Sequence, residues 1–304
     1  MRRNVAVAIL AAAALAGCSK GGSVDMSKGG LELVYEAAPT GTDDTRAAAL
    51  ADGARKVAQA RLNAAKIPAA VKLDGRKVRV GLPTGEGASK VEEAKKLLAV
   101  GGKVELREVL DAQFLKELGK DLPEESPVKV DQDKWEDANE KKKGCFIVDA
   151  TTEEEGRKVF PKEKLPSGAE LMRQQGLPGE HVVLYAVGAP FVTSEGIATA
   201  KVLKDPVSTP ATILKLTPDA AKSLEVTTQK IIGKKFAIVL DGVIVTTPVA
   251  LGVLSGGELP LPQPDVGDRP SREKAAQLMA VALNAGAFNS PLTLVEERQV
   301  AKSR

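Results

Sequence analysis

The chain has 304 residues, a formal net charge of +3 and only 3% aromatic residues. A nearly neutral chain with few aromatic rings lacks the basic surface that binds phosphate backbones and the platforms on which bases stack. No nucleic-acid partner is therefore expected. The length leaves room for two domains.

The first eighteen residues have the pattern of an export signal. Arg2 and Arg3 form a basic start, residues 5–16 are apolar, and Leu-Ala-Gly precedes Cys18. The apolar run is shorter than the ~20 residues that a membrane-spanning helix needs. Leu-Ala-Gly-Cys resembles the lipobox of bacterial lipoproteins, in which the cysteine becomes the lipid-modified first residue of the mature chain. The alternative is an ordinary secretory signal followed by an unrelated cysteine.

The lipobox resemblance implies an envelope protein that is lipid-anchored and faces the periplasm. It implies several acyl chains on Cys18, and several chains hold a protein firmly where a single chain does not. Ser19 stands where enterobacterial lipoproteins of the inner membrane carry an aspartate, which favours the outer membrane. Residues 18–29 are rich in Gly, Ser and Lys and are predicted to form a flexible tether.

Residues 30–110 alternate between strand and helix patterns. Period-two runs predict strands, and apolar residues at helical spacing predict helices. Asp74-Gly75 is typical of a hairpin turn. The expected elements are strands at 31–36, 71–73, 77–82 and 104–109 and helices at 42–65 and 90–100. Their order, β-α-β-β-α-β, predicts a ferredoxin-like base in an α+β protein, with 104–109 as its final strand.

The next stretch, residues 111–180, has no clear periodicity. Its first half is rich in Lys, Glu and Asp and includes Pro123 and Pro127, which predicts an exposed, partly irregular insertion. Lysines 141–143 are expected to lie on a solvated face, and 145–150 is expected to be a strand. After lipidation Cys145 would be the one remaining cysteine, so no intramolecular disulfide is expected. Its apolar neighbours favour a packed thiol over a reactive one.

Regular patterns return at residue 181 and predict an α+β head. Thr217 and Pro218 are typical of a helix start, and Asp241-Gly242 of a hairpin turn. The Gly- and Pro-rich residues 254–270 are expected to form a loop. The expected regular elements are strands at 181–187, 212–216, 236–240, 243–247 and 292–298 and helices at 218–232 and 271–283.

No group of residues predicts catalysis or metal binding. His181 is the only histidine and begins an apolar strand, where a structural role is expected. The chain has no Gly-x-Ser-x-Gly elbow and no cluster of His, Cys and carboxylates at metal-ligand spacing. We expect no enzyme activity, no catalytic residue, no metal and no cofactor. The alternative is a hydrolase that uses carboxylates far apart in the sequence.

Several short segments occur in a characteristic order. They are 28–36, 54–63 with its terminal Arg61-Leu62-Asn63, 78–83, 94–98, 104–107, 233–248, 255–257, 283–287 and 291–300. Together they resemble the large periplasmic domain of the SecD protein-export subunit. The resemblance covers roughly residues 28–108 and 181–300.

The resemblance implies a ferredoxin-like base with a head inserted before the final strand of the base. It also implies that the head holds an emerging polypeptide and moves relative to the base, coupled to proton flow through membrane helices. The sequence departs from this pattern, because the lipid signal stands in place of the first membrane helix and the chain ends where the second would begin. The arginine of the family's Leu-Arg-Gly-Gly is Lys28, and residues 111–180 do not align. We therefore expect no proton path.

The predicted division is a signal (1–17), a tether (18–29), a base (30–110 plus 290–300), a charged insertion or connector (111–180) and a head (181–289). The predicted function is to bind unfolded or translocating polypeptide and assist export, with Sec translocase components as further partners. The candidate binding surface is the loop from Leu251 to Leu261, with Leu254, Leu259 and Leu261 as the candidate binding residues, although these leucines could instead pack on the head. The alternative function is a docking subunit that binds no substrate.

Overall fold

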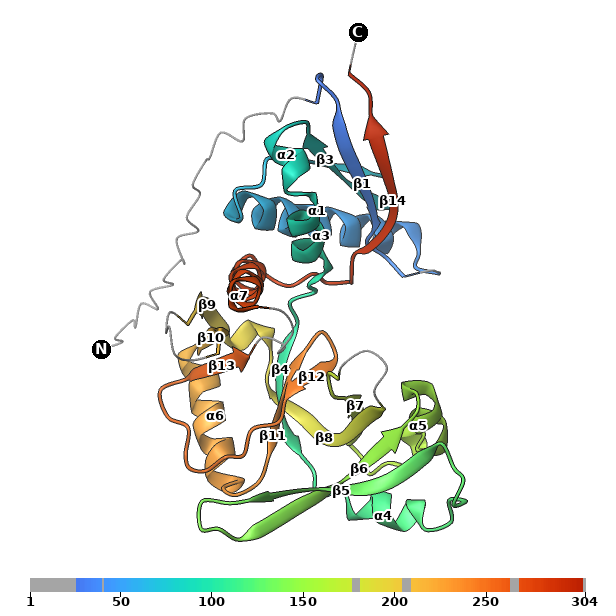
Figure 1. The fold of residues 1–304 in the computed structure, drawn as a ribbon, viewed down its shortest axis with the longest axis vertical. Helices are drawn as coiled ribbons and strands as arrows, with labels where there is room; N and C mark the ends of the chain where they lie inside the picture. The colour runs from blue at the N-terminus through green and yellow to red at the C-terminus, as the bar shows by residue number, and fades with distance from the viewer. Residues whose placement is uncertain (1–25, 40, 177–180, 204–208, 263–267, 303–304) are drawn as a thin grey trace, which may run out of the picture.

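The computed structural model describes residues 26–302 except 40, 177–180, 204–208 and 263–267. Two bodies are visible in Figure 1, a base beside the C-terminus and a larger head, with helix α7 (Arg269–Asn284) between them. Cys18 and the tether up to residue 25 lie outside the described residues.

The base is an antiparallel four-stranded sheet with helices packed on one face. Alternation in the first strand directs Leu31, Leu33 and Tyr35 into a core shared with the helices. Asp43 caps the first helix by accepting a hydrogen bond from the Arg46 amide (2.9 Å). The strands, in sheet order, are β14 (Thr293–Val300), β1 (Gly30–Glu36), β3 (Lys77–Pro83) and β2 (Ala70–Asp74). The helices are α1 (Asp44–Ala64), α2 (Glu86–Ser89) and α3 (Val91–Ala99).

The final strand of the base is β14, and the prediction that residues 104–109 fill this position is wrong. Residues Val104–Val109 do form a strand, β4, but it pairs with β8 and β11 of the head. The alternating pattern of this run indicates a strand without indicating its partner. β14 pairs with β1 from Gly30–Val300 to Glu36–Thr293. The ferredoxin-like base with an inserted α+β head is thus confirmed, with the insertion lying between α3 and β14.

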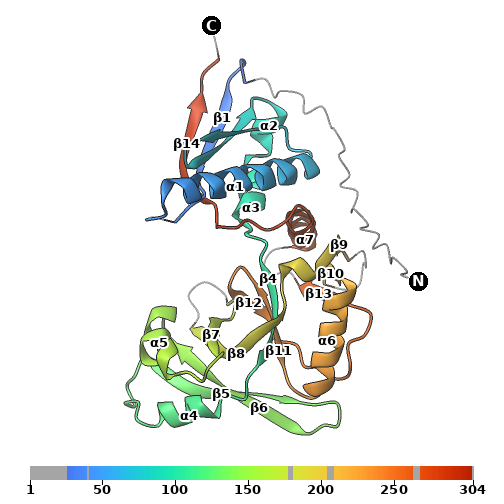
Figure 2. The ribbon, with the colours of Figure 1, turned by 180° about the vertical axis from the view of Figure 1, so that it is seen from behind.

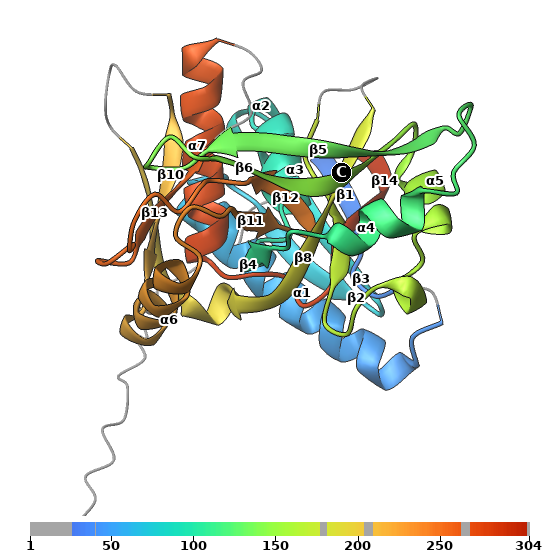
Figure 3. The ribbon, with the colours of Figure 1, turned by 90° about the horizontal axis from the view of Figure 1, so that it is seen from below.

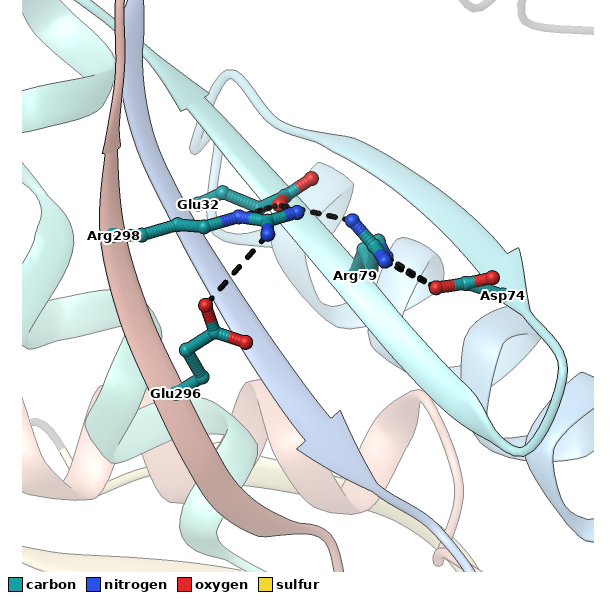
Figure 4. Close-up of polar contacts among 5 residues, drawn as sticks. All are labelled: Glu32, Asp74, Arg79, Glu296 and Arg298. Atoms are coloured by element: carbon teal, nitrogen blue, oxygen red, sulfur yellow. Dashed lines mark hydrogen bonds and ion pairs between the residues drawn. The ribbon is translucent and has the colours of Figure 1, made fainter.

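Ion pairs across the outer face of the base sheet reinforce the pairing of β14 (Figure 4). Glu32 accepts a hydrogen bond from Nε of Arg298 (2.7 Å) and lies 3.4 Å from the Arg79 guanidinium. Arg79 also donates to Asp74 (2.8 Å), and Arg298 lies 3.6 Å from Glu296. These contacts link all four strands of the sheet by opposite charges on neighbouring strands.

The head contains two sheets. In the larger, seven-stranded sheet, the order along the main path is β12 (Val243–Thr246), β11 (Phe236–Leu240), β4, β8 (Val182–Val192), β6 (Lys142–Ala150) and β5 (Val128–Glu136), and β7 (Glu170–Arg173) also pairs with β8. A parallel bridge between Gln174 and Ile244 joins β7 to β12, so strands β4, β8, β7, β12 and β11 form a closed ring. The smaller sheet has the order β13 (Glu258–Pro262), β10 (Ala211–Leu216) and β9 (Ile197–Val202). Helix α6 (Pro218–Lys230) packs against both sheets (Figure 2).

The charged first half of the insertion is partly irregular, as predicted, but it also contains a helix and a strand, and the strand predicted at 145–150 is confirmed within β6. The stretch 111–176 is part of the head. It forms α4 (Gln113–Gly119), β5, β6, α5 (Glu153–Val159) and β7. Figure 1 shows β5, β6 and α4 at the end of the head farthest from the base, and in the view from below β5 and α4 lie in front (Figure 3). The few apolar residues, among them Leu115, Val148, Phe160 and Leu171, build a separate core. The charged majority lies outside this core, and lysines 141–143 are exposed as predicted.

Helix α7 contributes to the cores of both bodies. Leu278 and Ala282 pack in the core of the base, and Ala280 packs in a core of the head. Its Lys274 pairs with Glu93 of α3 (2.8 Å). The chain passes between the bodies twice, at residues 100–103 and again at 285–292, and these two connectors meet beside α1.

Candidate functional site

The leucines predicted to bind polypeptide do not form an exposed surface. Leu259 and Leu261 are 4% and 1% exposed, which contradicts their assignment as a binding surface. Both lie in β13, which pairs with β10 and directs alternate side chains into the head core. Leu254 is half-buried and packs against the same core. Part of the predicted loop, Glu258–Pro262, is therefore a strand. Pro260 and Pro262 made it resemble a loop in sequence, but an edge strand such as β13 tolerates proline.

Exposed aliphatic side chains of the head lie instead at the end of α6. Leu251 is 60% exposed, Ile232 50% and Val253 43%. The Gly233 amide donates to the Ala250 carbonyl (2.8 Å), which holds the loop that carries Leu251 and Val253 beside the segment that carries Ile232. We call Ile232, Leu251 and Val253 the apolar ridge. Three exposed aliphatic side chains on adjacent segments indicate a surface that a partner could cover.

A polar network attaches the ridge to the large sheet. The Trp135 indole on β5 donates to the Gly233 carbonyl (2.9 Å), and the Lys235 ammonium lies 4.9 Å from the centre of the Trp135 ring. Lys235 also pairs with Asp133 (2.5 Å), which accepts a hydrogen bond from the Tyr185 hydroxyl (2.7 Å). Asp133 and Trp135, which belong to the stretch predicted to be a solvated insertion, thus hold the segment that follows α6 in position.

Cys145 is buried beside this network. It is 2% exposed and packs with Tyr185, Met172 and Ile147. Burial raises the pKa of its thiol to about 12, and the negative charge of Asp133 acts in the same direction. The packed thiol is confirmed.

We expect a thiol-alkylating reagent at pH 8 to modify Cys145 at least about 100-fold more slowly in the folded chain than in denaturant. The buried thiol is sterically shielded and stays protonated, whereas the nucleophile is the thiolate.

The raised pKa of Cys145 also makes the free energy of unfolding depend on pH. Its contribution is fully present below the unfolded pKa of 9.0 and is lost as the pH rises towards about 12. Unfolding measured from pH 8 to 11 should therefore show a shallower decline for Cys145→Ala than for the parent chain. A fast-reacting native thiol would contradict this assignment, with Val226→Cys, an exposed position, as the reference.

Arg61 of α1 lies where the two connectors meet. Its side chain is completely buried and donates to the carbonyls of Leu97 (3.1 Å), Val100, Gly101 (3.0 Å) and Gly286 (2.7 Å). The guanidinium carbon lies 4.1 Å from the centre of the Phe288 ring. Burial lowers the pKa of Arg61 to about 10, and the Asp241 carboxylate acts in the opposite direction, so the guanidinium remains charged at neutral pH.

The periodic pattern predicts that Arg61 lies within a helix, but it does not indicate a role for Arg61 in the fold. The available signal was its position, because it follows the buried Ala54 and Ala58 at helical spacing. A charged residue in a buried stripe requires partners, and here the partners are backbone carbonyls of distant segments.

The remaining polar candidates form no reactive constellation in the part of the chain that the structure describes. His181 is largely exposed and pairs with Asp149 (2.8 Å). No group of three or more His, Cys, Asp or Glu residues among residues 26–302, outside the gaps named above, could hold a metal ion. Among the described helices, none combines the length and the apolar character required to cross a membrane.

Comparison with known families and sequences gives a consistent result. Residues 169–290 match the family described as SecDF, P1 head subdomain. The chain is 34% identical over 114 residues to the protein translocase subunit SecDF of Thermus thermophilus, covering 38% of this chain and 15% of that protein. It is 30% identical over 152 residues to SecD of Endomicrobium trichonymphae, covering 49% of this chain and 30% of that protein. The chain thus spans less than a third of the length of either relative.

Solved structures show the same fold. The crystal structure of SecDF in a super-membrane-facing form matches 91% of this chain and 31% of its own, with a TM-score of 0.57 and 22% identity. A second structure, described as that of a membrane component SecDF that enhances protein export, matches 88% of this chain and 99% of its own, with a TM-score of 0.53 and 22% identity. The chain thus shares the fold of these SecDF structures over most of its length, and its residues 169–290 are similar to the P1 head subdomain.

Proposed function

We propose that this chain is a lipid-anchored, periplasm-facing module of protein export whose head binds unfolded or translocating polypeptide. The observation that carries the proposal is the P1 head match at residues 169–290, a region that contains the whole apolar ridge. The similar sequences are protein translocase subunits. Polypeptide in transit and components of the Sec translocase are the partners that this likeness suggests.

The ridge suits an unfolded chain because its side chains are aliphatic and exposed. An unfolded polypeptide exposes apolar side chains in many sequences, and burying them against Leu251 and Val253 gains roughly 25 cal/mol per Å² of apolar surface. Such binding requires no catalytic group, and the proposal assigns no chemical step to the chain. The anchor would be lipid on Cys18, in the outer membrane if Ser19 has the sorting effect expected of it.

We expect Leu251→Ser combined with Val253→Ser to weaken binding of an unfolded secretory polypeptide by about 10- to 100-fold. The change removes two exposed aliphatic side chains without creating a cavity in the core. Binding can be measured by fluorescence anisotropy of a labelled, unfolded precursor protein. The matched control is Leu73→Ser with Leu294→Ser, which removes two leucines of the base that are 41% and 39% exposed.

Equal affinity of the ridge variant and the parent would contradict the role of the ridge. Parent binding no stronger than that of an unrelated lipoprotein would contradict polypeptide capture altogether. Independently of the binding measurement, photocrosslinking from position 251 in native membranes separates capture from the docking alternative, which requires one stoichiometric partner. A heterogeneous mixture of crosslinked chains would support capture.

A further inference from the structure

Two side chains of different character bind the connector at residues 100–103. One is the buried Arg61, which binds carbonyls of both connectors. The other is Asp241, an exposed residue in the turn between β11 and β12 of the head. The connectors also bind each other, because the Phe288 amide donates to the Gly101 carbonyl (2.9 Å).

Asp241 holds the first connector through three hydrogen bonds. Its carboxylate accepts from the amides of Gly101 (2.8 Å) and Lys103 (2.9 Å). Its own amide donates to the Lys103 carbonyl (2.8 Å). Asp241 and Gly242 have φ values of +54° and +82°, so they form the two-residue turn that matches the twist of a hairpin.

The connector is shaped to receive both attachments. A Cβ atom at Gly101 would lie 2.4 Å from Oδ1 of Asp241, and one at Gly102 would lie 2.9 Å from the Arg61 guanidinium. Gly102 also has a φ of +88°, which favours glycine. Consecutive glycines therefore allow one side chain from each body to reach the same short segment of backbone.

We propose that the Asp241 carboxylate is a releasable latch that sets the angle of the head on the base, with Arg61 as the pivot that stays bound. The two attachments differ in their access to water. Water can replace the amide donors of the exposed Asp241, whereas breaking the Arg61 contacts would leave a buried charge and several carbonyls without partners. Opening therefore begins at Asp241. Because α7 also packs Leu278 and Ala282 into the base core, release changes the angle without detaching the head.

A cavity of about 500 Å³ beside the latch would change width as the head turns. Base helix α3 and the second connector contribute Ala99, Phe288 and Pro291, and the head contributes Met172 and Gly242. The latch is a property of the unliganded chain, so it does not depend on the proposed binding of polypeptide.

The test measures the distance between spin labels on base and head by double electron–electron resonance. The labels are attached at Leu73→Cys in the base and Val226→Cys in the head, both exposed positions, in the full chain with Cys18→Ser and Cys145→Ala. Asp241→Gly removes both carboxylate acceptors and keeps a residue that tolerates positive φ. We expect a narrow distribution for the parent and, for Asp241→Gly, a broader one with a second population shifted by several ångströms. Hydrogen exchange at 101–103 should rise at least about 10-fold.

Asp241→Asn preserves a favoured Asn-Gly turn and one acceptor, so it should give an intermediate distribution and provides the readout if the glycine variant unfolds. The matched control is Asp137→Asn, because Asp137 also accepts two amides, from Asn139 (2.9 Å) and Lys141 (3.0 Å), but within the β5–β6 hairpin. The control should leave the distance distribution unchanged. The proposal would be overturned if the distance distributions of the Asp241 variants had the same width and centre as that of the parent. It would also be overturned if the distribution of the parent were already broad.

Discussion

Replacing Arg61 with leucine is expected to lower the free energy of unfolding by about 3–5 kcal/mol, because a buried acceptor left without its donor costs about 1–3 kcal/mol and several carbonyls lose a donor here. The substitution leaves the carbonyls of Leu97, Val100, Gly101 and Gly286 buried with fewer donors. It also removes the stacking on Phe288. Equilibrium unfolding in urea, followed by circular dichroism, measures the loss. Lysine at this position should recover only part of it, because one ammonium cannot replace a planar fork of donors.

The matched control for this substitution lies on the same helix. Arg55 is 31% exposed at its side chain and pairs with Asp52 one turn away (3.0 Å). A surface pair of this kind contributes at most about 1 kcal/mol, so Arg55→Leu should change stability by no more than that. Equal effects at positions 55 and 61 would show that the junction contacts contribute little to stability.

Cys18→Ser is expected to abolish lipid attachment and to move the protein out of the fraction that remains with membranes after a high-salt wash. The sulfur of Cys18 is the atom that would carry the lipid. A serine hydroxyl cannot substitute for it in the lipoprotein pathway that the Leu-Ala-Gly-Cys resemblance implies. Incorporation of radiolabelled palmitate and separation of inner from outer membranes measure attachment and location together. Ser19→Asp is the companion variant, which should shift the protein towards the inner membrane if the enterobacterial sorting rule applies.

The alternative for the N-terminus predicts a different result. An ordinary secretory signal would be cleaved equally well in the parent and in Cys18→Ser, and both proteins would be released without lipid. Lipid incorporation that persists in Cys18→Ser would instead place the attachment at another residue.

Local turn and cap chemistry made several elements of this fold predictable. Asp241-Gly242 forms the predicted hairpin turn, whereas the hairpin predicted at Asp74-Gly75 turns one residue later, at Gly75-Arg76, with positive φ at both Gly75 and Gly242. Thr217 caps α6 by accepting a hydrogen bond from the Ala220 amide, and Pro218 takes the first helical turn. These features depend on residues close together in the chain, so a single sequence contains the whole signal.

Residues 111–168 show where local patterns were insufficient. β5 is charged along most of its length because it is an edge strand whose only strand partner among the described residues is β6. An edge strand can carry charge on its exposed positions, so its composition resembles that of a loop. This region also lies outside the residues that match the P1 head family.

The candidate site depended most strongly on tertiary structure. The sequence pattern singled out the leucines between 251 and 261, but only the pairing of β13 with β10 decided that Leu259 and Leu261 are buried while Leu251 remains exposed. Asp241 was predictable as a turn residue, whereas its contact with Gly101 joins positions 140 residues apart.

By itself, the sequence predicts an export signal, and it determined the hairpins, the principal helices and the ferredoxin-like order of elements up to residue 99, because these follow from periodicity and short-range chemistry. Tertiary structure alone decided that β14 and not residues 104–109 completes the base, that Arg61 joins the two connectors, and which apolar residues remain on the surface. The physical reason is the same in each case. A periodic pattern specifies which side of an element is buried, whereas the element that covers it is set by contacts between distant parts of the chain.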